Sequence, residues 1–448
     1  MAVPPPASRH LFRRAEAPLV AARAEGCWVA DAAGNRYLDG AGGAIVVGIG
    51  HGDERVVAAM ADQARRLAYV HAATFTTEAM ERYADDLAPY VPVDDVRAYP
   101  VSGGAEAVET ALKLARAYHV ARGEPGRDVL VARAGSYHGN SLGALDVSGR
   151  VSLRAPYLPW LGRAVHVPHV SEYRCPAATH PDRCGEWHAA ELERTIVDLG
   201  AGRVAAFIGE AIGGATLGAA IPPPDYWAAV AEVCRRHGVL LVVDEVMTGF
   251  GRTGRWFGID HWGVRPDVVV VGKGASSGYW PLGICLASGA VHDEVMGGGG
   301  FVHGTTFSHH PVGAAVARAV LGRIVELDLV EASAATGRRL LGGLRDALGA
   351  ERHVGDVRGL GLLVAVELVA DHERRTAFPR SVRLAERVAA EALARGLVVY
   401  PSTGCADGVD GDVVLVGPPL VISDDEVDLL VERLAGAVGA AITSVVGG

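Results

Sequence analysis

Residues 238–245 read GVLLVVDE and residues 267–273 read DVVVVGK. Both runs are short and rich in valine, as is typical of strands buried on both faces of a sheet. The first run leads to Asp244 and the second to Lys273, which lies 29 positions later. Parallel strands bring their carboxyl ends to one edge of a sheet, where binding crevices form. We therefore expect Asp244 and Lys273 to face the same crevice.

A pattern of short apolar run, glycine-rich turn and amphipathic helix repeats before this stretch. VRAYPVSGG leads into AEAVETALKLARAYHVARG, and the runs DVLVARAG and VAAFIGEA follow. This alternation predicts an α/β fold with a mostly parallel central sheet and helices on both faces. After about residue 325, long helices alternate with runs such as LGLLVAVEL, which predicts a smaller α+β domain. The predicted division is an amino-terminal arm joining the small domain (1–60), a large domain (61–325) and a carboxyl-terminal small domain (326–448).

Composition narrows the class of protein. A chain of 448 residues, half of them hydrophobic, is long enough for two or three domains with buried cores. Its net charge of −10, with basic residues interspersed among acids, disfavours a nucleic-acid surface. Its apolar runs fall short of the roughly 20 residues of a membrane span. The amino terminus does not read as a secretory signal, so we expect a cytoplasmic protein with small-molecule partners.

The six cysteines (Cys27, Cys175, Cys184, Cys234, Cys285 and Cys405) are scattered, which favours reduced thiols over a disulfide framework. Cys175, His180, Cys184 and His188 have the spacing C-x4-H-x3-C-x3-H and could close a zinc site. A polar surface insertion is the favoured interpretation, because the C-x2-C spacing of structural zinc sites is missing. We expect no metal at the catalytic site.

Three further features complete a binding site for one cofactor. Gly103, Gly104 and Ala105 begin a helix, whose free N–H groups and dipole suit a phosphate. Lys273 can hold an aldehyde as a Schiff base, and Asp244 can keep a pyridine nitrogen protonated. Together these groups indicate pyridoxal phosphate and hence an enzyme. A Gly-rich turn alone would be a weak signal, since many such turns only start helices.

The loop after the strand DVLVA and the segment after Asp244 can supply the two faces of the pyridine ring. Tyr137, beside His138, offers an aromatic face, and Val246 lies on the same side of the extended chain as Asp244. Ordinary core packing remains an alternative for Tyr137, and it is nearly as good an explanation for Val246.

Over nearly its whole length the chain resembles the class III aminotransferases, of the fold type I pyridoxal-phosphate superfamily. The segments that carry the resemblance are DGAGGAIVVGIGH (39–51), SGGAEAVETALKLAR (102–116), SYHGNSLGA (136–144), VVDEVMTGFGRTGRWF (242–257), GKG around Lys273, HGTTFSHHP (303–311), RGLGLL (358–363) and PPLVIS (418–423). Agreement on so many ordered segments is not expected by chance.

The resemblance implies a role for each matching residue. The catalytic pair is Lys273, as Schiff-base lysine and proton carrier, and Asp244, as partner of the ring nitrogen. The implied cofactor-binding residues are Gly104, Ala105, Tyr137, His138, Glu210, Asp244, Val246, Met247, Lys273 and Thr306. Thr306 matches a threonine that the family contributes to the phosphate from the neighbouring subunit. The resemblance therefore implies a homodimer with shared active sites.

Several positions differ from relatives and bear on the substrate. Relatives that act on ornithine or 4-aminobutyrate have a glutamate where this chain has Ala215 and arginines where it has Asn140 and Leu415. Tyr400 stands where pyruvate-dependent amine transaminases carry a mobile arginine. A carboxylate-bearing substrate must therefore find its cation elsewhere. Alignment with relatives gives Ala44, Ile45, Asn140 and Tyr400 as substrate-pocket candidates.

The expected activity is transfer of an amino group between a primary amine or non-standard amino acid and an oxo-acid or aldehyde, by a ping-pong mechanism. The alternative is another pyridoxal-phosphate reaction on the same fold: aminomutase, epimerase, lyase or decarboxylase. A binding protein without turnover is a third hypothesis, but it predicts loss of the lysine or the acid. Both residues are present.

Overall fold

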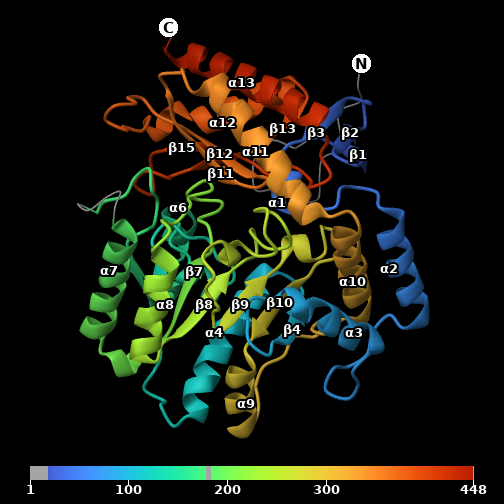
Figure 1. Cartoon of the computed structure of the whole chain (residues 1–448), viewed down its shortest axis with the longest axis vertical. Helices are drawn as coiled ribbons and strands as arrows, with labels where there is room; N and C mark the ends of the chain where they lie inside the picture. Colours follow the sequence, from blue (N-terminus) through green and yellow to red (C-terminus); the bar gives the residue numbers. More distant parts are fainter. Residues whose placement is uncertain (1–18, 178–182, 447–448) are drawn as a thin grey trace.

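Figure 1 shows the computed structural model of the protein, which describes residues 19–177 and 183–446. A central sheet of seven strands has the order β4-β10-β9-β8-β7-β5-β6. Its strands are β4 (Arg97–Val101), β5 (Val129–Arg133), β6 (Ala164–Val167), β7 (Val204–Glu210), β8 (Leu240–Asp244), β9 (Val268–Val271) and β10 (Gly283–Ala287). Only β10 runs antiparallel to its neighbours within this sheet. The sheet is therefore mostly parallel, as the valine-rich runs predict.

Helices cover both faces of this sheet because successive strand residues point to opposite sides. On β8, Leu240 and Val242 face a cluster with α4 (Gly104–Ala121), α5 (Leu142–Val147) and α9 (Gly289–Gly297). Leu241 and Val243 face a second cluster that includes α7 (Cys184–Leu199), α8 (Tyr226–His237) and α10 (Pro311–Glu326). Two further helices, α2 (Glu54–Arg66) and α3 (Glu78–Leu87), pack against α10. This arrangement confirms the expected fold class.

A second, antiparallel sheet has the order β11-β12-β15-β14 and lies at the top of Figure 1. Its strands are β11 (Val354–Leu360), β12 (Leu363–Leu368), β15 (Asp412–Val416) and β14 (Tyr400–Thr403). The helices α11 (Leu329–Leu348), α12 (Leu384–Ala394) and α13 (Asp424–Val446) lie with this sheet. Among the described residues, α13 is the one helix long and apolar enough to cross a membrane, but it packs against α11 and α12, as core helices do.

The amino-terminal strands belong to a third, small sheet, β1 (Ala21–Glu25), β2 (Trp28–Asp31), β3 (Arg36–Asp39) and β13 (Leu397–Val398). β13 pairs with β3 in parallel, so the start of the chain joins a segment that follows α12. This pairing accords with an amino-terminal arm that joins the small domain. The domain boundaries near residues 60 and 325 stay a prediction.

Candidate active site

Asp244 and Lys273 face one cavity at the carboxyl ends of β8 and β9. Asp244 is the last residue of β8, and Lys273 opens a short 3-10 turn two residues after β9 ends. The cavity has a volume of about 290 Å³, near the lower end of the range for small-molecule sites, roughly 300 Å³. The sequence-predicted residues that line it are Gly104, Ala105, Tyr137, His138, Asn140, Glu210, Asp244, Val246, Met247 and Lys273.

The Asp244 carboxylate is held by two donors. Its Oδ2 atom lies 2.7 Å from Nδ1 of His138, and its Oδ1 atom accepts a hydrogen bond from the backbone N–H of Val246 at 2.9 Å. Only 4% of Asp244 is exposed, and the other ring nitrogen of His138, Nε2, is buried with no hydrogen-bond partner. The arrangement fixes the carboxylate beside the cavity.

Glu210 lies next to Asp244 in register on the neighbouring strand β7. Its Oε2 atom accepts from the backbone N–H of Tyr137 at 3.2 Å, and its Oε1 atom accepts from that of Gly214 at 2.9 Å. Burial raises the pKa of the Glu210 carboxyl, and His138 and Arg133 oppose that rise. Glu210 thus ties two loops of the cavity to the end of β7.

Lys273 has an unusual backbone and a perturbed amine. Its φ of +40° is in the left-handed region, which non-glycine residues seldom occupy and which marks a position held by its surroundings. Burial lowers the pKa of its amine, while the Asp244 and Glu210 carboxylates oppose that change. The Lys273 amine therefore becomes neutral at a lower pH than the amine of a solvent-exposed lysine does.

The start of α4 makes a tight turn at the cavity. α4 begins at Gly104, and the first N–H groups of a helix have no partner within the helix. A Cβ at Gly104 would lie 2.9 Å from Cγ1 of Val246, and one at Gly139 (φ +131°) would lie 2.7 Å from Cβ of Ala105. Glycine at these two positions therefore allows the turn to pack closely against Val246 and the loop that contains Gly139.

Four predicted residues are not in the lining of this cavity. Thr306 lies in the loop before α10, where its carbonyl accepts a hydrogen bond from the Tyr69 hydroxyl at 2.9 Å. Ala44 is exposed in the short helix α1 (Gly42–Ile45). Ile45 is buried with φ +58°, and with Tyr400 it belongs to an apolar cluster that includes Met247, a residue of the lining. The structure therefore joins Ile45 and Tyr400 to the site through two residues of its lining, Met247 and Ile212.

Leu415 belongs to the same apolar cluster and is fully buried. It lies on β15, opposite Tyr400 of β14 and Ala365 of β12. A position that carries an arginine in some relatives is therefore part of a hydrocarbon core in this chain.

Sequence reasoning missed the anchor of the loop that follows Glu210. Arg358 of β11 donates from Nε to the Gly218 carbonyl at 2.7 Å and from Nη2 to the Leu217 carbonyl at 2.6 Å. Its Nη1 atom donates to Oε2 of Glu367 at 2.7 Å, and the guanidinium is buried. An arginine in a strand that alternates with buried apolar residues was the available signal, since such a cation must find acceptors. The second sheet thereby holds a loop of the site.

Arg252 makes a similar connection. Its guanidinium is buried and donates to the Leu362 carbonyl at 3.0 Å, the Pro418 carbonyl at 2.5 Å and the Val47 carbonyl at 3.3 Å. Burial lowers its pKa to about 10. The side chain joins the segment after β8 to three other parts of the chain, and it is not in the lining of the cavity.

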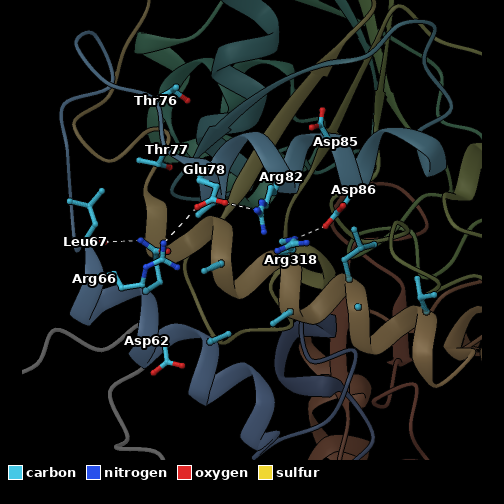
Figure 2. Close-up of a pocket in the computed structure, with 18 of the residues that line it drawn as sticks. Asp62, Arg66, Leu67, Thr76, Thr77, Glu78, Arg82, Asp85, Asp86 and Arg318 are labelled. Atoms are coloured by element: carbon cyan, nitrogen blue, oxygen red, sulfur yellow. Dashed lines mark hydrogen bonds and ion pairs between the residues drawn. The ribbon is translucent and has the colours of Figure 1, made fainter.

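A larger groove, which shares no lining residue with this cavity, lies between α2, α3 and α10 (Figure 2). Its volume is about 1090 Å³, and several of its charged side chains form ion pairs within the lining. Glu78 pairs with Arg66 at 3.6 Å and with Arg82 at 2.5 Å, while Arg318 pairs with Asp86 at 2.5 Å. Another groove, beside β4 and α9, has a volume of about 1220 Å³. Neither groove contains the perturbed lysine and the paired carboxylate, which select the smaller cavity as the reaction site.

The structure bears in part on whether the Cys175–His188 segment could bind zinc. Among residues 19–177 and 183–446, no group of three or more His, Cys, Asp or Glu side chains is placed to hold a metal ion. His180 lies outside the described residues.

Comparison with known proteins identifies the family. Residues 12–438 match the family described as aminotransferase class-III, and the chain belongs to that family. It is therefore an enzyme, a transferase of amino groups.

Individual relatives are also aminotransferases or transaminases by name. The uncharacterized aminotransferase YodT of Bacillus subtilis (strain 168) is 37% identical over 424 residues, which cover 94% of this chain and 95% of that protein. The putrescine–pyruvate aminotransferase of Pseudomonas aeruginosa is 32% identical over 411 residues, covering 91% and 88% of the two chains. The crystal structure of an (S)-enantioselective omega-transaminase from Thermomicrobium roseum has a TM-score of 0.90 and 38% identity, covering 95% and 94%.

Proposed function

We propose that this aminotransferase uses pyridoxal phosphate and transfers an amino group between a primary amine or non-standard amino acid and an oxo-acid or aldehyde. The observation that carries the proposal is the convergence of Lys273, Asp244 and the start of α4 on one cavity. An amine, a held carboxylate and open backbone N–H groups match the aldehyde, ring nitrogen and phosphate of that cofactor.

The residues present fit the cofactor in chemistry and in space. Asp244 would face the ring nitrogen, with His138 fixing the carboxylate. The turn at Gly104 and Ala105 would take the phosphate, and glycine there lets the turn pack closely against Val246. Val246 and Tyr137 would bound the ring faces. When bound, the cofactor supplies an electron sink for the carbanion formed at the substrate carbon.

Lys273 is the residue we assign to proton transfer. Its Nζ atom would remove the proton from the substrate carbon that bears the amine. It would then return that proton to the carbon on the other side of the amine nitrogen, which is a 1,3 shift. A base works best when its pKa lies near the working pH, and burial moves the pKa of Lys273 down from 10.5 in that direction. The strained backbone at residue 273 accords with a side chain held for one task.

We propose that the substrate pocket is largely apolar on the side of β14 and β15. Ile212 and Met247 line the cavity and belong to the same apolar cluster as Ile45, Leu415 and Tyr400. A substrate carboxylate placed against this side would lose its hydration without gaining a cation. Amine donors with an apolar chain accord better with this wall, whereas putrescine, which the name of one relative gives as its substrate, would have to place its second ammonium elsewhere.

We further propose a homodimer in which Thr306 reaches the partner's site. The loop around Thr306 exposes large apolar side chains, with Val302 at 92% and Phe307 at 60%. Tyr69, which bonds the Thr306 carbonyl, packs its ring edge-on to Phe307 with centroids 6.3 Å apart. Phe75 is 61% exposed. Exposed aromatic and aliphatic side chains of this size are typical of protein interfaces.

We keep the cytoplasm as the proposed location. None of the six cysteines, all of them within the described residues, forms a disulfide, which accords with a reducing compartment.

A half-reaction tests the proposed function. The purified protein is loaded with pyridoxal phosphate and mixed with a single amine, such as putrescine, without any acceptor. We expect the cofactor's visible absorbance to be lost and then restored when pyruvate is added, with alanine formed in equal amount. Release of carbon dioxide or ammonia without that reversible change would contradict transamination and favour another reaction of the same cofactor.

A further inference from the structure

Two thiols and an imidazole lie together at the start of α7, away from the catalytic cavity. Sγ of Cys175 is 3.7 Å from Nε2 of His188, and Cys175 is near enough to Cys184 to help raise the pKa of its thiol. Cys184 is the first residue of α7 and His188 lies one turn further on. None of the three lines the cavity that holds Lys273. The assigned activity therefore leaves this group without a role.

The two thiols differ in access to solvent. Cys175 is half-buried, whereas Cys184 is 1% exposed. Burial and the neighbouring Cys175 raise the pKa of the Cys184 thiol to about 12, and Asp225 and Glu172 act in the same direction. A soluble reagent therefore meets Cys175 first, and Cys184 is protected from direct attack. The other four cysteines of the chain are all buried.

His188 is placed to accept a hydrogen bond from the Cys175 thiol. Burial, with His169 and Arg133, lowers the pKa of His188 to about 4, so its ring is neutral at pH 7. A neutral imidazole has one nitrogen that can accept a hydrogen bond, and Nε2 is the nitrogen that faces Cys175. A ring with so low a pKa is too weak a base to take the thiol proton, so His188 orients the Cys175 thiol and solvent takes its proton.

We propose that Cys175 and Cys184 form a reversible modification site, which a low-molecular-weight disulfide such as oxidised glutathione converts to an intramolecular disulfide. The Cys175 thiolate attacks one sulfur of the reagent, so that a mixed disulfide forms and one reagent thiol leaves. Cys184 then gives up its proton and attacks the Cys175 sulfur, which releases the second reagent thiol. The protein loses two electrons and two protons, and the reagent gains them as two thiols.

The local structure favours a bond between these two sulfurs. Cys175 contacts His188, and Cys184 lies four residues before His188 on α7, so both thiols border the same face of this helix. The residue before Cys175 is anchored, since Nε of Arg174 donates to Oε1 of Glu367 at 2.5 Å and its Nη1 donates to the Arg375 carbonyl at 2.8 Å. At the other end, the N–H of Glu186 is bound by Oδ2 of Asp225 at 2.9 Å. Both flanks of the pair are therefore fixed.

A metal ion on the same thiols is the competing idea, and His180, the fourth member of that spacing, lies outside the described residues. No group of three or more ligating side chains in residues 19–177 and 183–446 is placed to hold a metal. The remaining nitrogen of His188, Nδ1, is buried without a hydrogen-bond partner, whereas ligating histidines almost always donate from that second nitrogen.

Peptide mapping tests the proposal on the full chain. The protein is reduced, freed of reductant, incubated with oxidised glutathione, alkylated in denaturant and cleaved with trypsin. Cleavage after Arg174, Arg183 and Arg194 leaves Cys175 and Cys184 on separate peptides. We expect these two peptides joined by a disulfide that dithiothreitol separates, while Cys27, Cys234, Cys285 and Cys405 remain alkylated thiols.

Two variants give the order of the steps. Cys184→Ser should stop at glutathione attached to Cys175, and Cys175→Ser should leave Cys184 as an unreacted thiol. The proposal is overturned if wild-type protein carries glutathione on both residues separately, or if neither reacts. It is also overturned if the reduced protein binds one zinc ion that both serine variants lose, because the group would then be a metal site.

Discussion

Oδ2 of Asp244 and Nδ1 of His138 lie 2.7 Å apart, and both side chains are buried beside the cavity that also holds Lys273. The carboxylate comes from the end of β8 and the imidazole from the loop after β5, so this contact reaches across the end of β7, which lies between these two strands. A carboxylate held in this way is set up to bind one further donor from the cavity. We take that donor to be the ring nitrogen of the cofactor.

Replacing Asp244 by Asn removes the charge and keeps the shape. The amide can still contact His138, so we expect the folded structure and some cofactor binding to persist. The rate should fall by several orders of magnitude, because the protonated ring nitrogen loses its anionic partner. Single-turnover kinetics with saturating amine measure this effect. A fall of less than about tenfold would contradict the electron-sink assignment.

Arg358→Lys should loosen the loop that follows Glu210. Lysine keeps a positive charge near Glu367 but cannot donate to both the Leu217 and Gly218 carbonyls in the geometry of arginine. We expect the KM for the amine to rise about tenfold, equivalent to about 1.4 kcal/mol, while the cofactor stays bound to Lys273. Steady-state kinetics measure the change in KM, and the absorbance of the cofactor shows whether it stays bound.

Arg339→Lys is the matched control, because Arg339 forms an exposed ion pair with Asp428 at 2.5 Å. Surface pairs of this kind contribute little, so its kinetics should stay at the wild-type level. Equal kinetics in the two variants would mean that Arg358 does not position the loop.

Glu245 predicts a pH dependence of stability. It is buried next to Asp244 and accepts from the N–H of Gly258 at 2.8 Å and of Ile259 at 2.6 Å. Burial raises its pKa from an ordinary value of 4.5 to about 7. The folded state therefore binds more protons than the unfolded state between these values, so this group's contribution to the free energy of unfolding falls as pH rises from 4.5 to about 7.

The expected loss is about 3 kcal/mol across that window. Urea unfolding of wild type and Glu245→Gln at several pH values measures it, since glutamine does not titrate. The wild type should become less stable relative to the variant as pH rises. A constant difference between the two proteins would show that Glu245 does not titrate in this range.

Phe307→Glu tests the proposed dimer. Phe307 is 60% exposed beside Thr306, and a charge buried at an interface without a partner is costly. We expect the variant to sediment as a monomer and to lose activity. Val197→Glu, at an equally exposed position on α7, should remain dimeric. If both variants behave as the wild type does, the interface lies elsewhere.

The sequence predicted the features that depend on local pattern. Valine runs that end in Asp244 and Lys273 sufficed for parallel strands with a shared edge, and the structure has that arrangement. It could not predict contacts that arise from packing between distant elements. The grip of Arg358 on the loop after Glu210 depends on how the second sheet docks, and no spacing in the chain encodes that geometry. Likewise Leu415 reads only as an apolar residue until β14 and β12 flank it.

Borohydride reduction followed by peptide mapping tests the central claim most directly. Borohydride fixes pyridoxal phosphate to the amine that carries it, and mass spectrometry of the digest locates that amine. We predict a single modified residue, Lys273, and no modification in Lys273→Ala. A cofactor fixed to another lysine, or none retained by a folded wild-type protein, would contradict the account.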